Sequence, residues 1–382
     1  MGTGEAPGAD PPITWSEDSN IRWKTPLPGL GHASPVVWGD RIFILTAVPA
    51  RSAERRNSFH YQVLAIDRSD GSIIWRRTAR TEPPHESRHE TASWASCSPV
   101  TDGEHVIASF GSRGIYCYDM DGNLQWEKDF GDLRIRYQWG EGASPALSGD
   151  RVIVTWDHDG RSFIAMLDKR TGKEIWRTSR DDGTSWASPL VVEHNGRKQI
   201  VAPSINAVRS FDFDTGAELW RTRGMTTNPV PTPVAANGIV YLMGGYRESV
   251  LLAVSLNNPG AVLWDYNRDT PYVPSPALYG GSLYFVKVNT NMITSLDART
   301  GKPHFARKRL PGISGIYASP AAANGRVYFA GRNGVTVVVN HGTDFEVLAE
   351  NVLDDKFDAS PAIAGDEIIL RGHGFLYCIF DK

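Results

Sequence analysis

Cysteine, long apolar runs and a surplus of charge of one sign are all scarce in this sequence of 382 residues. Three cysteines cannot form a disulfide framework, so burial and hydrogen bonding must stabilise the fold. No apolar run approaches the ~20 residues of a membrane-spanning helix, and the first residues lack the basic start and apolar middle of a signal peptide. With a net charge of −3 and 41% hydrophobic residues, we expect a folded chain with no nucleic-acid partner and no membrane span.

Prolines preceded by Ser or Thr recur along the whole chain. Successive copies lie 41 to 46 residues apart, except for a first interval of 64 residues. The eight copies are Ser34-Pro35, Ser98-Pro99, Ser144-Pro145, Ser188-Pro189, Thr232-Pro233, Ser275-Pro276, Ser319-Pro320 and Ser360-Pro361. Each is followed by β-rich runs that Gly or Asn turns separate, and no segment has the periodicity of an amphipathic helix.

Four short strands in about 44 residues are typical of one β-propeller blade. The repeats therefore predict an all-β fold, an eight-bladed β-propeller of four-stranded blades. The last copy ends at residues 375–381 without its fourth strand, whereas residues 18–25 match such a strand before the first copy. We expect the N-terminal strand to close the ring, with residues 1–17 as a tail and residues 18–382 as a single propeller domain.

A second pattern runs from an Asp through a Thr-Gly turn to a Trp. It is clearest in residues 165–176, Ala-Met-Leu-Asp-Lys-Arg-Thr-Gly-Lys-Glu-Ile-Trp, and in residues 212–220. The pattern resembles the repeat of the pyrroloquinoline-quinone-type propeller family, which includes quinoprotein alcohol dehydrogenases and the propeller of an outer-membrane assembly lipoprotein. The resemblance implies that the Trp of each blade docks on its neighbour. Segments such as residues 180–189 look most similar to uncharacterised, mostly exported bacterial propellers.

The resemblance also implies a place of action and a choice between two functions. We expect a periplasmic or otherwise exported monomer, with its export signal absent from this chain. It would act as a non-catalytic binding or scaffold protein for a protein partner or a small ligand. The alternative is a quinone-dependent oxidoreductase, a dehydrogenase of alcohols or sugars.

Cysteine spacing bears on that alternative. In the resembled enzymes a Trp and a vicinal Cys-Cys disulfide sandwich the quinone, and carboxylates with an Asn hold a calcium or lanthanide ion. Here Cys97, Cys117 and Cys378 are isolated from one another. We therefore expect no cofactor and no metal ion and assign no catalytic residue, with pyrroloquinoline quinone and calcium kept as the alternative.

Two sets of loops lie on one face of a propeller and form its usual ligand side: those that enter each inner strand and those that join the second strand to the third. We call it the loop face. Its candidate residues are His32, Trp94, Arg113, Trp139, His158, Trp186, Asn206, Tyr246, Lys287, Asn289, Tyr317, Arg332, Phe357 and His373. Aromatic rings interleaved with basic side chains favour an anionic or flat ligand near the axis. Alternatively, the aromatics fill gaps between blades and the charges line a solvated funnel.

Two features of the loops are left over. His85 and His89 have the spacing of a two-histidine zinc helix but follow two prolines in a predicted loop, so a coincidental match is the alternative to a metal site. The long first interval places extra residues at 48–59 and 80–93. These form either a disordered pair of loops or a lid that carries Arg51, Arg55, Arg56, His85 and His89.

Overall fold

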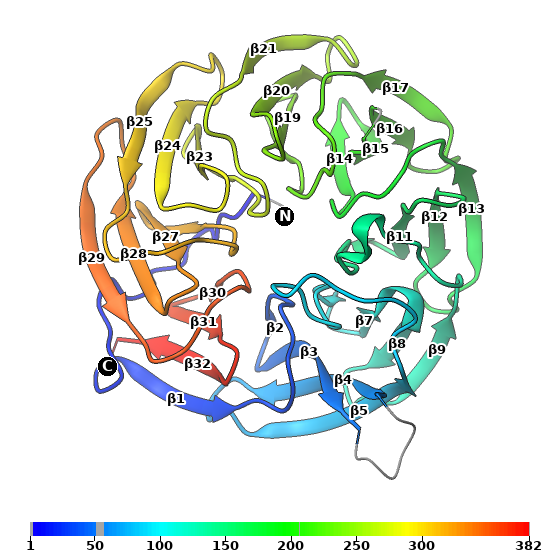
Figure 1. The fold of residues 1–382 in the computed structure, drawn as a ribbon, viewed down its shortest axis with the longest axis horizontal. Helices are drawn as coiled ribbons and strands as arrows, with labels where there is room; N and C mark the ends of the chain where they lie inside the picture. Colours follow the sequence, from blue (N-terminus) through cyan, green and yellow to red (C-terminus); the bar gives the residue numbers. More distant parts are fainter. Residues whose placement is uncertain (1–2, 51–56, 206, 382) are drawn as a thin grey trace.

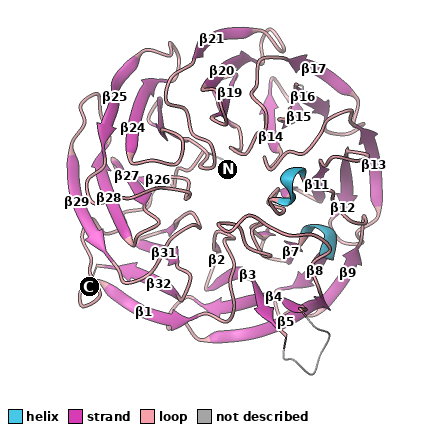
Figure 2. Ribbon diagram, in the orientation of Figure 1, coloured by secondary structure: helices cyan, strands magenta, loops and turns pink. Residues whose placement is uncertain are grey.

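Eight antiparallel sheets of four strands surround a central axis (Figure 1). The computed structural model describes residues 3–50, 57–205 and 207–381. Within these ranges the only helices are two short 3-10 turns, η1 (Gly111–Arg113) and η2 (Arg136–Gln138) (Figure 2). The described residues contain no helix that is long and apolar enough to cross a membrane. The predicted all-β, eight-bladed propeller is confirmed.

The chain runs outward from the axis through the four strands of a blade before it enters the next. Blade 1 contains β2 (Val36–Trp38), β3 (Arg41–Pro49), β4 (Phe59–Asp67) and β5 (Ile73–Glu82). Blade 2 contains β6 (Val100–Thr101), β7 (His105–Ser109), β8 (Ile115–Asp119) and β9 (Leu124–Lys128). Blade 3 contains β10 (Ala146–Ser148), β11 (Arg151–Trp156), β12 (Phe163–Asp168) and β13 (Glu174–Ser179). Blade 4 contains β14 (Leu190–His194), β15 (Arg197–Ala202), β16 (Val208–Asp212) and β17 (Glu218–Thr222).

The second half of the ring repeats this order. Blade 5 contains β18 (Val234–Ala236), β19 (Ile239–Gly244), β20 (Val250–Ser255) and β21 (Val262–Tyr266). Blade 6 contains β22 (Ala277–Tyr279), β23 (Ser282–Val286), β24 (Met292–Asp297) and β25 (Pro303–Arg309). Blade 7 contains β26 (Ala321–Ala323), β27 (Arg326–Ala330), β28 (Val335–Asn340) and β29 (Val347–Val352). Blade 8 contains β30 (Ala362–Ala364), β31 (Glu367–Arg371) and β32 (Phe375–Phe380), and takes β1 (Ile21–Pro26) as its outer strand.

Pairing of β1 with β32 closes the ring. The two strands are antiparallel, with Trp23 opposite Cys378 and Thr25 opposite Leu376. Without β1, the edge of β32 would expose a row of unpaired N–H and C=O groups. The pairing with β1 satisfies these groups. The predicted closure by the N-terminal strand is confirmed.

The Asp-to-Trp pattern forms the contact between neighbouring blades. In blade 3 the Asp168 carboxylate accepts hydrogen bonds from the backbone N–H and the hydroxyl of Thr171, at 2.9 and 2.8 Å, and so closes the turn before β13. Gly172 follows with a φ of 67°, and a Cβ there would lie 2.7 Å from ring atoms of Trp126 in blade 2. The Trp126 indole Nε1 donates to the Lys169 carbonyl at 2.7 Å. The Trp of one blade thus docks on the turn of the next, as the resemblance implied.

Trp220 departs from this arrangement. The usual contact, from the indole Nε1 to a carbonyl of the next blade at 2.8 to 3.1 Å, joins Trp23 to Arg68, Trp75 to Met120, Trp176 to Phe213 and Trp264 to Arg299. Trp220 instead donates to the side chain of Gln199 in its own blade, at 2.7 Å. Residues 257–260 of blade 5 are Asn-Asn-Pro-Gly, in place of a Thr-Gly turn.

Part of the tail predicted at residues 1–17 hydrogen-bonds to inner strands of the propeller. The N–H of Ala322 donates to the Gly4 carbonyl, and the N–H of Ala6 donates to the Ala322 carbonyl, both at 2.8 Å. Trp15 is only 5% exposed. The chain therefore begins near the axis and runs outward beneath blades 6 and 7 to reach β1 (Figure 1).

The extra length of the first interval goes partly into strands. β3, β4 and β5 have 9, 9 and 10 residues, whereas the corresponding strands of the other blades have 5 to 7. The loop predicted at residues 48–59 is therefore shorter than expected, because strand pairing continues to Pro49 opposite Phe59. Arg51, Arg55 and Arg56, predicted for a lid, lie outside the described residues.

Candidate ligand-binding funnel

The Ser or Thr of each Ser-Pro copy lies near the axis and links one blade to the next. The N–H of Ser34 donates to the Ser98 hydroxyl and the N–H of Ser98 to the Ser144 hydroxyl, each at 2.9 Å. The same bond, at 2.9 to 3.1 Å, joins Ser144 to Ser188, Thr232 to Ser275, Ser275 to Ser319, Ser319 to Ser360 and Ser360 to Ser34. We call these residues the hydroxyl ring. A hydroxyl that accepts one N–H keeps its own hydrogen for a further acceptor.

A cavity of about 430 Å³, here called the funnel, opens above the hydroxyl ring on the loop face. Seven members of the ring line it: Ser34, Ser98, Ser144, Ser188, Thr232, Ser319 and Ser360. Its aromatic lining consists of Trp139, Trp186, Tyr272 and Tyr317, and its ionisable lining of His32, His89, Glu141 and Asp358. The volume falls within the ~300 to 1,000 Å³ of small-molecule sites.

Predicted aromatic residues form a continuous wall of the funnel. The ring centroid of Trp139 lies 6.3 Å from that of Trp186 and 5.8 Å from that of Tyr246, which it meets edge-on at 82°. Tyr246 extends the row to Tyr272 at 5.1 Å. Tyr317, also predicted, lines the same cavity. Because each ring is held by its neighbours, the wall presents aromatic faces and edges that need little ordering to bind a ligand.

Tyr137 was not among the predicted residues. Its ring is 58% exposed, and its centroid lies 4.8 Å from that of Trp139. Tyr137 and Gln138 have φ values of 57° and 53°, two consecutive left-handed residues other than glycine. Such a backbone costs about 1–3 kcal/mol per residue and tends to occur at functional sites. Here it places an exposed aromatic ring beside the funnel wall.

The basic residues predicted for an anionic ligand are paired with carboxylates. The pairs are Arg113 with Glu82 (2.7 Å) and Asp132, Lys287 with Asp269 (3.1 Å), and Arg332 with Asp358 (2.6 Å). A paired charge offers an anion much less attraction than a free one. The structure therefore favours the flat ligand over the anionic ligand of the sequence-based hypothesis.

Asp358 brings three predicted residues together at the funnel wall. Its Oδ2 lies 2.9 Å from Nε2 of His373 and 3.8 Å from Nε2 of His32, and its Oδ1 accepts a hydrogen bond from Nε of Arg332 at 2.6 Å. The two imidazoles stack with centroids 5.1 Å apart. Burial lowers the pKa of His32 to about 4, despite the opposing charge of Asp358. Burial alone would raise the pKa of Asp358, but the hydrogen bonds from His373 and Arg332 lower it.

Two predicted aromatic residues pack between blades and do not line the funnel. Trp94 lies with its ring centroid 6.2 Å from that of Phe59. Phe357 is 0% exposed and packs against Tyr377, with centroids 5.9 Å apart. The gap-filling alternative describes these two rings.

Two further predicted residues, His158 and Asn289, stand apart from the funnel lining. The buried His158 accepts a hydrogen bond at Nδ1 from the N–H of Arg134 at 3.0 Å. The Asn289 side-chain oxygen accepts one from the N–H of Val273 at 2.9 Å, and so shapes a loop. Asn206 lies outside the described residues.

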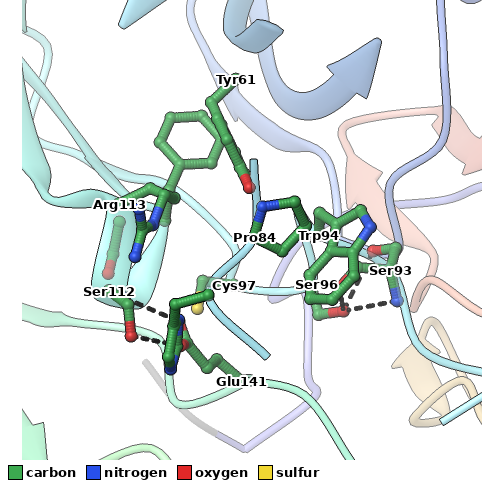
Figure 3. Close-up of a pocket in the computed structure, with 12 residues that line it drawn as sticks. Tyr61, Pro84, Ser93, Trp94, Ser96, Cys97, Ser112, Arg113 and Glu141 are labelled. Carbon is green, nitrogen blue, oxygen red and sulfur yellow. Dashed lines mark hydrogen bonds between the residues drawn. The ribbon is translucent and has the colours of Figure 1, made fainter. Parts of the chain in front are cut away.

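A second cavity, of about 20 Å³, lies beside the funnel (Figure 3). Glu141 and Ser96 line both cavities. The Glu141 carboxylate accepts hydrogen bonds from the N–H of Ser112, at 2.8 Å, and from its hydroxyl, the dashed lines in Figure 3. Burial nevertheless raises the pKa of Glu141. The space suits about one water molecule beside this carboxylate.

His85 and His89 lie in a loop, as predicted, and have separate partners. The His85 Nε2 is 2.8 Å from the Leu133 carbonyl, and the His89 Nδ1 is 2.8 Å from the Thr91 hydroxyl. Without a helix, the spacing of the two residues does not bring their imidazoles to a common point.

The funnel does not supply the residues that the resemblance implies for a quinone and its calcium ion. Cys97, Cys117 and Cys378 are free and buried, and the Cys97 thiol donates to the Ala143 carbonyl at 3.3 Å. Among the described residues no Asn lines the funnel, so the Asn ligand of the calcium site has no counterpart there. A Trp that could stack is present, but among the described residues neither the vicinal disulfide nor the Asn ligand of that arrangement has a counterpart at the funnel.

Asp358, Glu141 and the hydroxyl ring were missed for an identifiable reason. The hydroxyls belong to the Ser-Pro repeat, whose spacing indicates the number of blades but not a binding role. Asp358 and Glu141 precede their Ser-Pro motifs by two and three residues. The predicted aromatic residues of the loops that enter the inner strands lie at similar positions. A polar side chain two or three residues before a Ser-Pro motif would have indicated these two funnel residues.

Comparisons with known proteins agree with the fold. The model of the family described as "Outer membrane protein assembly factor BamB" matches residues 12–132 and 112–329. The assembly factor BamB of Yersinia pestis is 22% identical over 91% of this chain and 85% of its own length. A polyvinylalcohol dehydrogenase of a Sphingopyxis species is 21% identical over 64% of this chain but only 46% of its own length.

Two solved structures show the same architecture. BamB from Moraxella catarrhalis superposes with a TM-score of 0.67 at 14% identity, over 94% of this chain and 96% of that one. A europium-containing methanol dehydrogenase gives 0.68 at 12% identity, over 98% and 88%. At such identities the likeness concerns the fold alone.

Proposed function

The chain belongs to the family described as outer membrane protein assembly factor BamB, and from this premise we propose that it is a non-catalytic binding protein that acts outside the cytoplasm. The loop face carries the binding site. The volume of the funnel and its position over the hydroxyl ring support this role. We expect no quinone cofactor to take part, and the lack of a matching disulfide and Asn among the described residues at the funnel supports this expectation.

The ligand is a neutral ring with several hydroxyl groups, such as a sugar residue. One observation carries this choice: aromatic side chains and a ring of hydroxyls line the same cavity. Aromatic faces bind the apolar faces of a sugar ring, and hydroxyl groups exchange hydrogen bonds with its hydroxyls. Arg113, Lys287 and Arg332 are paired with carboxylates, which leaves an anion little advantage.

A saccharide panel tests this proposal by isothermal titration calorimetry. The panel contains neutral hexose oligomers and the matching uronic-acid oligomers. We expect the neutral oligomers to bind, and Trp139→Ala and Trp186→Ala each to weaken binding roughly tenfold or more. Trp38→Ala is the control, since Trp38 is 48% exposed at the end of β2, away from the funnel. Binding of only the acidic oligomers, or equal affinity in all variants, would contradict the proposal.

Pyrroloquinoline quinone with Ca²⁺ tests the enzymatic alternative. A ligand at 100 times its Kd adds ~2.7 kcal/mol to the free energy of unfolding, so a thermal shift assay would detect it. We expect neither a shift nor dye-linked oxidation of alcohols or sugars. Quinone-dependent turnover would contradict the proposed non-catalytic function and support the dehydrogenase alternative.

Docking of a protein partner on the loop face is the second candidate function. Two exposed apolar side chains favour it, Tyr137 at 58% and Val288 at 38% exposure, each at a positive φ. Pull-down with the paired variant Tyr137→Ser and Val288→Ser separates the candidates. Loss of a protein partner together with unchanged saccharide binding would assign the two functions to different parts of the face.

A further inference from the structure

Two histidines and one aspartate converge at the funnel wall. His32, Asp358 and His373 each offer one ligand atom, and these atoms all lie within 4.8 Å of one another. The Asp358 Oδ2 is 2.9 Å from Nε2 of His373 and 3.8 Å from Nε2 of His32. Bonds of about 2.0–2.2 Å from one zinc-like ion to such atoms would place them about 3.3–3.5 Å apart, between these two distances.

Closure of the ring creates this cluster. His32 lies in the loop that enters blade 1, whereas Asp358 and His373 lie in two loops of blade 8. The N–H of His373 donates to the Lys356 carbonyl at 3.1 Å and to the Asp355 carboxylate at 3.0 Å, which fixes the position of its loop. The three side chains thus come from loops of neighbouring blades at the first and last positions of the ring.

His32 has an unused ligand atom. Its side chain is only 10% exposed, and its Nε2 is buried without a hydrogen-bond partner among the described residues. A buried polar atom of this kind costs free energy unless something binds it. The Asp358 carboxylate, whose Oδ2 is 3.8 Å from this nitrogen, also lines the funnel.

Asp358 is oriented so that one of its oxygens remains available. Arg332 holds Oδ1 through Nε at 2.6 Å, whereas its contact with Oδ2, through Nη2, is longer at 3.3 Å. A hydrogen bond from outside the ligand set commonly orients a metal-binding carboxylate in this way. Oδ2 is therefore the oxygen directed at the two imidazoles.

We propose that His32, Asp358 and His373 bind a divalent transition-metal ion such as Zn²⁺, with further coordination positions open to the funnel. Two imidazole nitrogens and one carboxylate oxygen suit zinc, cobalt, nickel or copper. Calcium prefers six to eight oxygen ligands, and only one carboxylate is present here.

A second cluster of possible metal ligands differs from this one, because a lysine side chain pairs with it. Asp102, Glu104 and His105 also lie within 4.8 Å of one another. There the ammonium group of Lys169 pairs with Asp102 and lies 3.8 Å from Glu104. A lysine side chain thus pairs with the ligand atoms of that cluster, whereas Arg332 contacts Asp358 chiefly at Oδ1, with its Nη2 3.3 Å from Oδ2.

Cobalt spectroscopy tests the site without reference to the sugar ligand. Tag-free, metal-stripped protein is titrated with Co²⁺, and absorption in the visible range reports imidazole coordination. We expect one equivalent of Co²⁺ to bind, Zn²⁺ to displace it, and Ca²⁺ to leave the spectrum unchanged. His32→Ala and His373→Ala should each weaken Co²⁺ binding at least tenfold.

His89→Ala is the matched control, because His89 lines the same funnel but bonds to Thr91. Its Co²⁺ spectrum should equal that of the unmodified chain. Circular dichroism establishes that each variant is folded, and the partly exposed His373 provides the milder change if His32→Ala does not fold. Absence of Co²⁺ binding to the unmodified chain, or equal binding in a folded His373→Ala variant, would overturn the metal site and leave the saccharide proposal untouched.

Discussion

Removal of the space between Gly172 and Trp126 tests how the blades are held together. Gly172→Ala places a Cβ 2.7 Å from two atoms of the Trp126 ring, at a residue whose φ is 67°. The positive φ costs about 1–2 kcal/mol for any residue with a Cβ, and overpacking adds about 1–3 kcal/mol. We therefore expect Gly172→Ala to lower the free energy of unfolding by about 2–5 kcal/mol.

Trp126→Ala separates these two contributions. This change alone should lower the free energy of unfolding by about 3–5 kcal/mol, because Trp126 is 8% exposed and donates a hydrogen bond to Lys169. With the ring gone, a Cβ at residue 172 no longer meets it. Gly172→Ala added to Trp126→Ala should therefore cost only the ~1–2 kcal/mol of the backbone. The double-mutant cycle should give a coupling of about 1–3 kcal/mol.

Urea unfolding followed by circular dichroism measures the four free energies, since fluorescence would change with the removed Trp. Gly149→Ala is the control, because Gly149 has a φ of 56° and a Cβ added there would meet no atom within 4 Å. It should cost about the same in both backgrounds. Additive effects of Gly172→Ala and Trp126→Ala would refute the docking of one blade on the next through this pair.

Three further changes follow from the same structure. Deletion of residues 1–25 removes β1 and exposes the edge of β32, so soluble monomer should disappear in size-exclusion chromatography, whereas deletion of residues 1–12 should only lower the Tm. Ser98→Ala leaves the Ser34 N–H without its acceptor and should lower the free energy of unfolding by about 1 kcal/mol, and Ser98→Thr should restore it. Burial raises the pKa of Asp157 from 3.8 to about 7, so its ionisation should lower the Tm as the pH rises from about 4 to 7, and Asp157→Asn should abolish that dependence. The charged groups that face Asp157 are Arg180, Asp182 and Arg209.

The architecture could be predicted because short local sequence patterns specify it and recur along the chain. A Ser-Pro pair, a Gly turn or an Asp-to-Trp pattern each specify a few residues of backbone, and their spacing counts the blades. Even the closing strand was recognisable, because residues 18–25 carry the local pattern that the last repeat lacks. The Trp220 contact was not predictable in the same way, since its partner is the side chain of Gln199 on another strand of the same blade.

The sequence by itself determined the propeller, the number of blades and the closure of the ring. Only the tertiary structure decided what those loops contain: that Arg113, Lys287 and Arg332 are paired, that Phe357 is buried, and that His32 meets Asp358 and His373. The physical reason is that strand periodicity depends on neighbours along the chain, whereas charge pairing and burial depend on neighbours in space. In a closed ring, the first and last blades are neighbours in space although their residues lie at opposite ends of the chain.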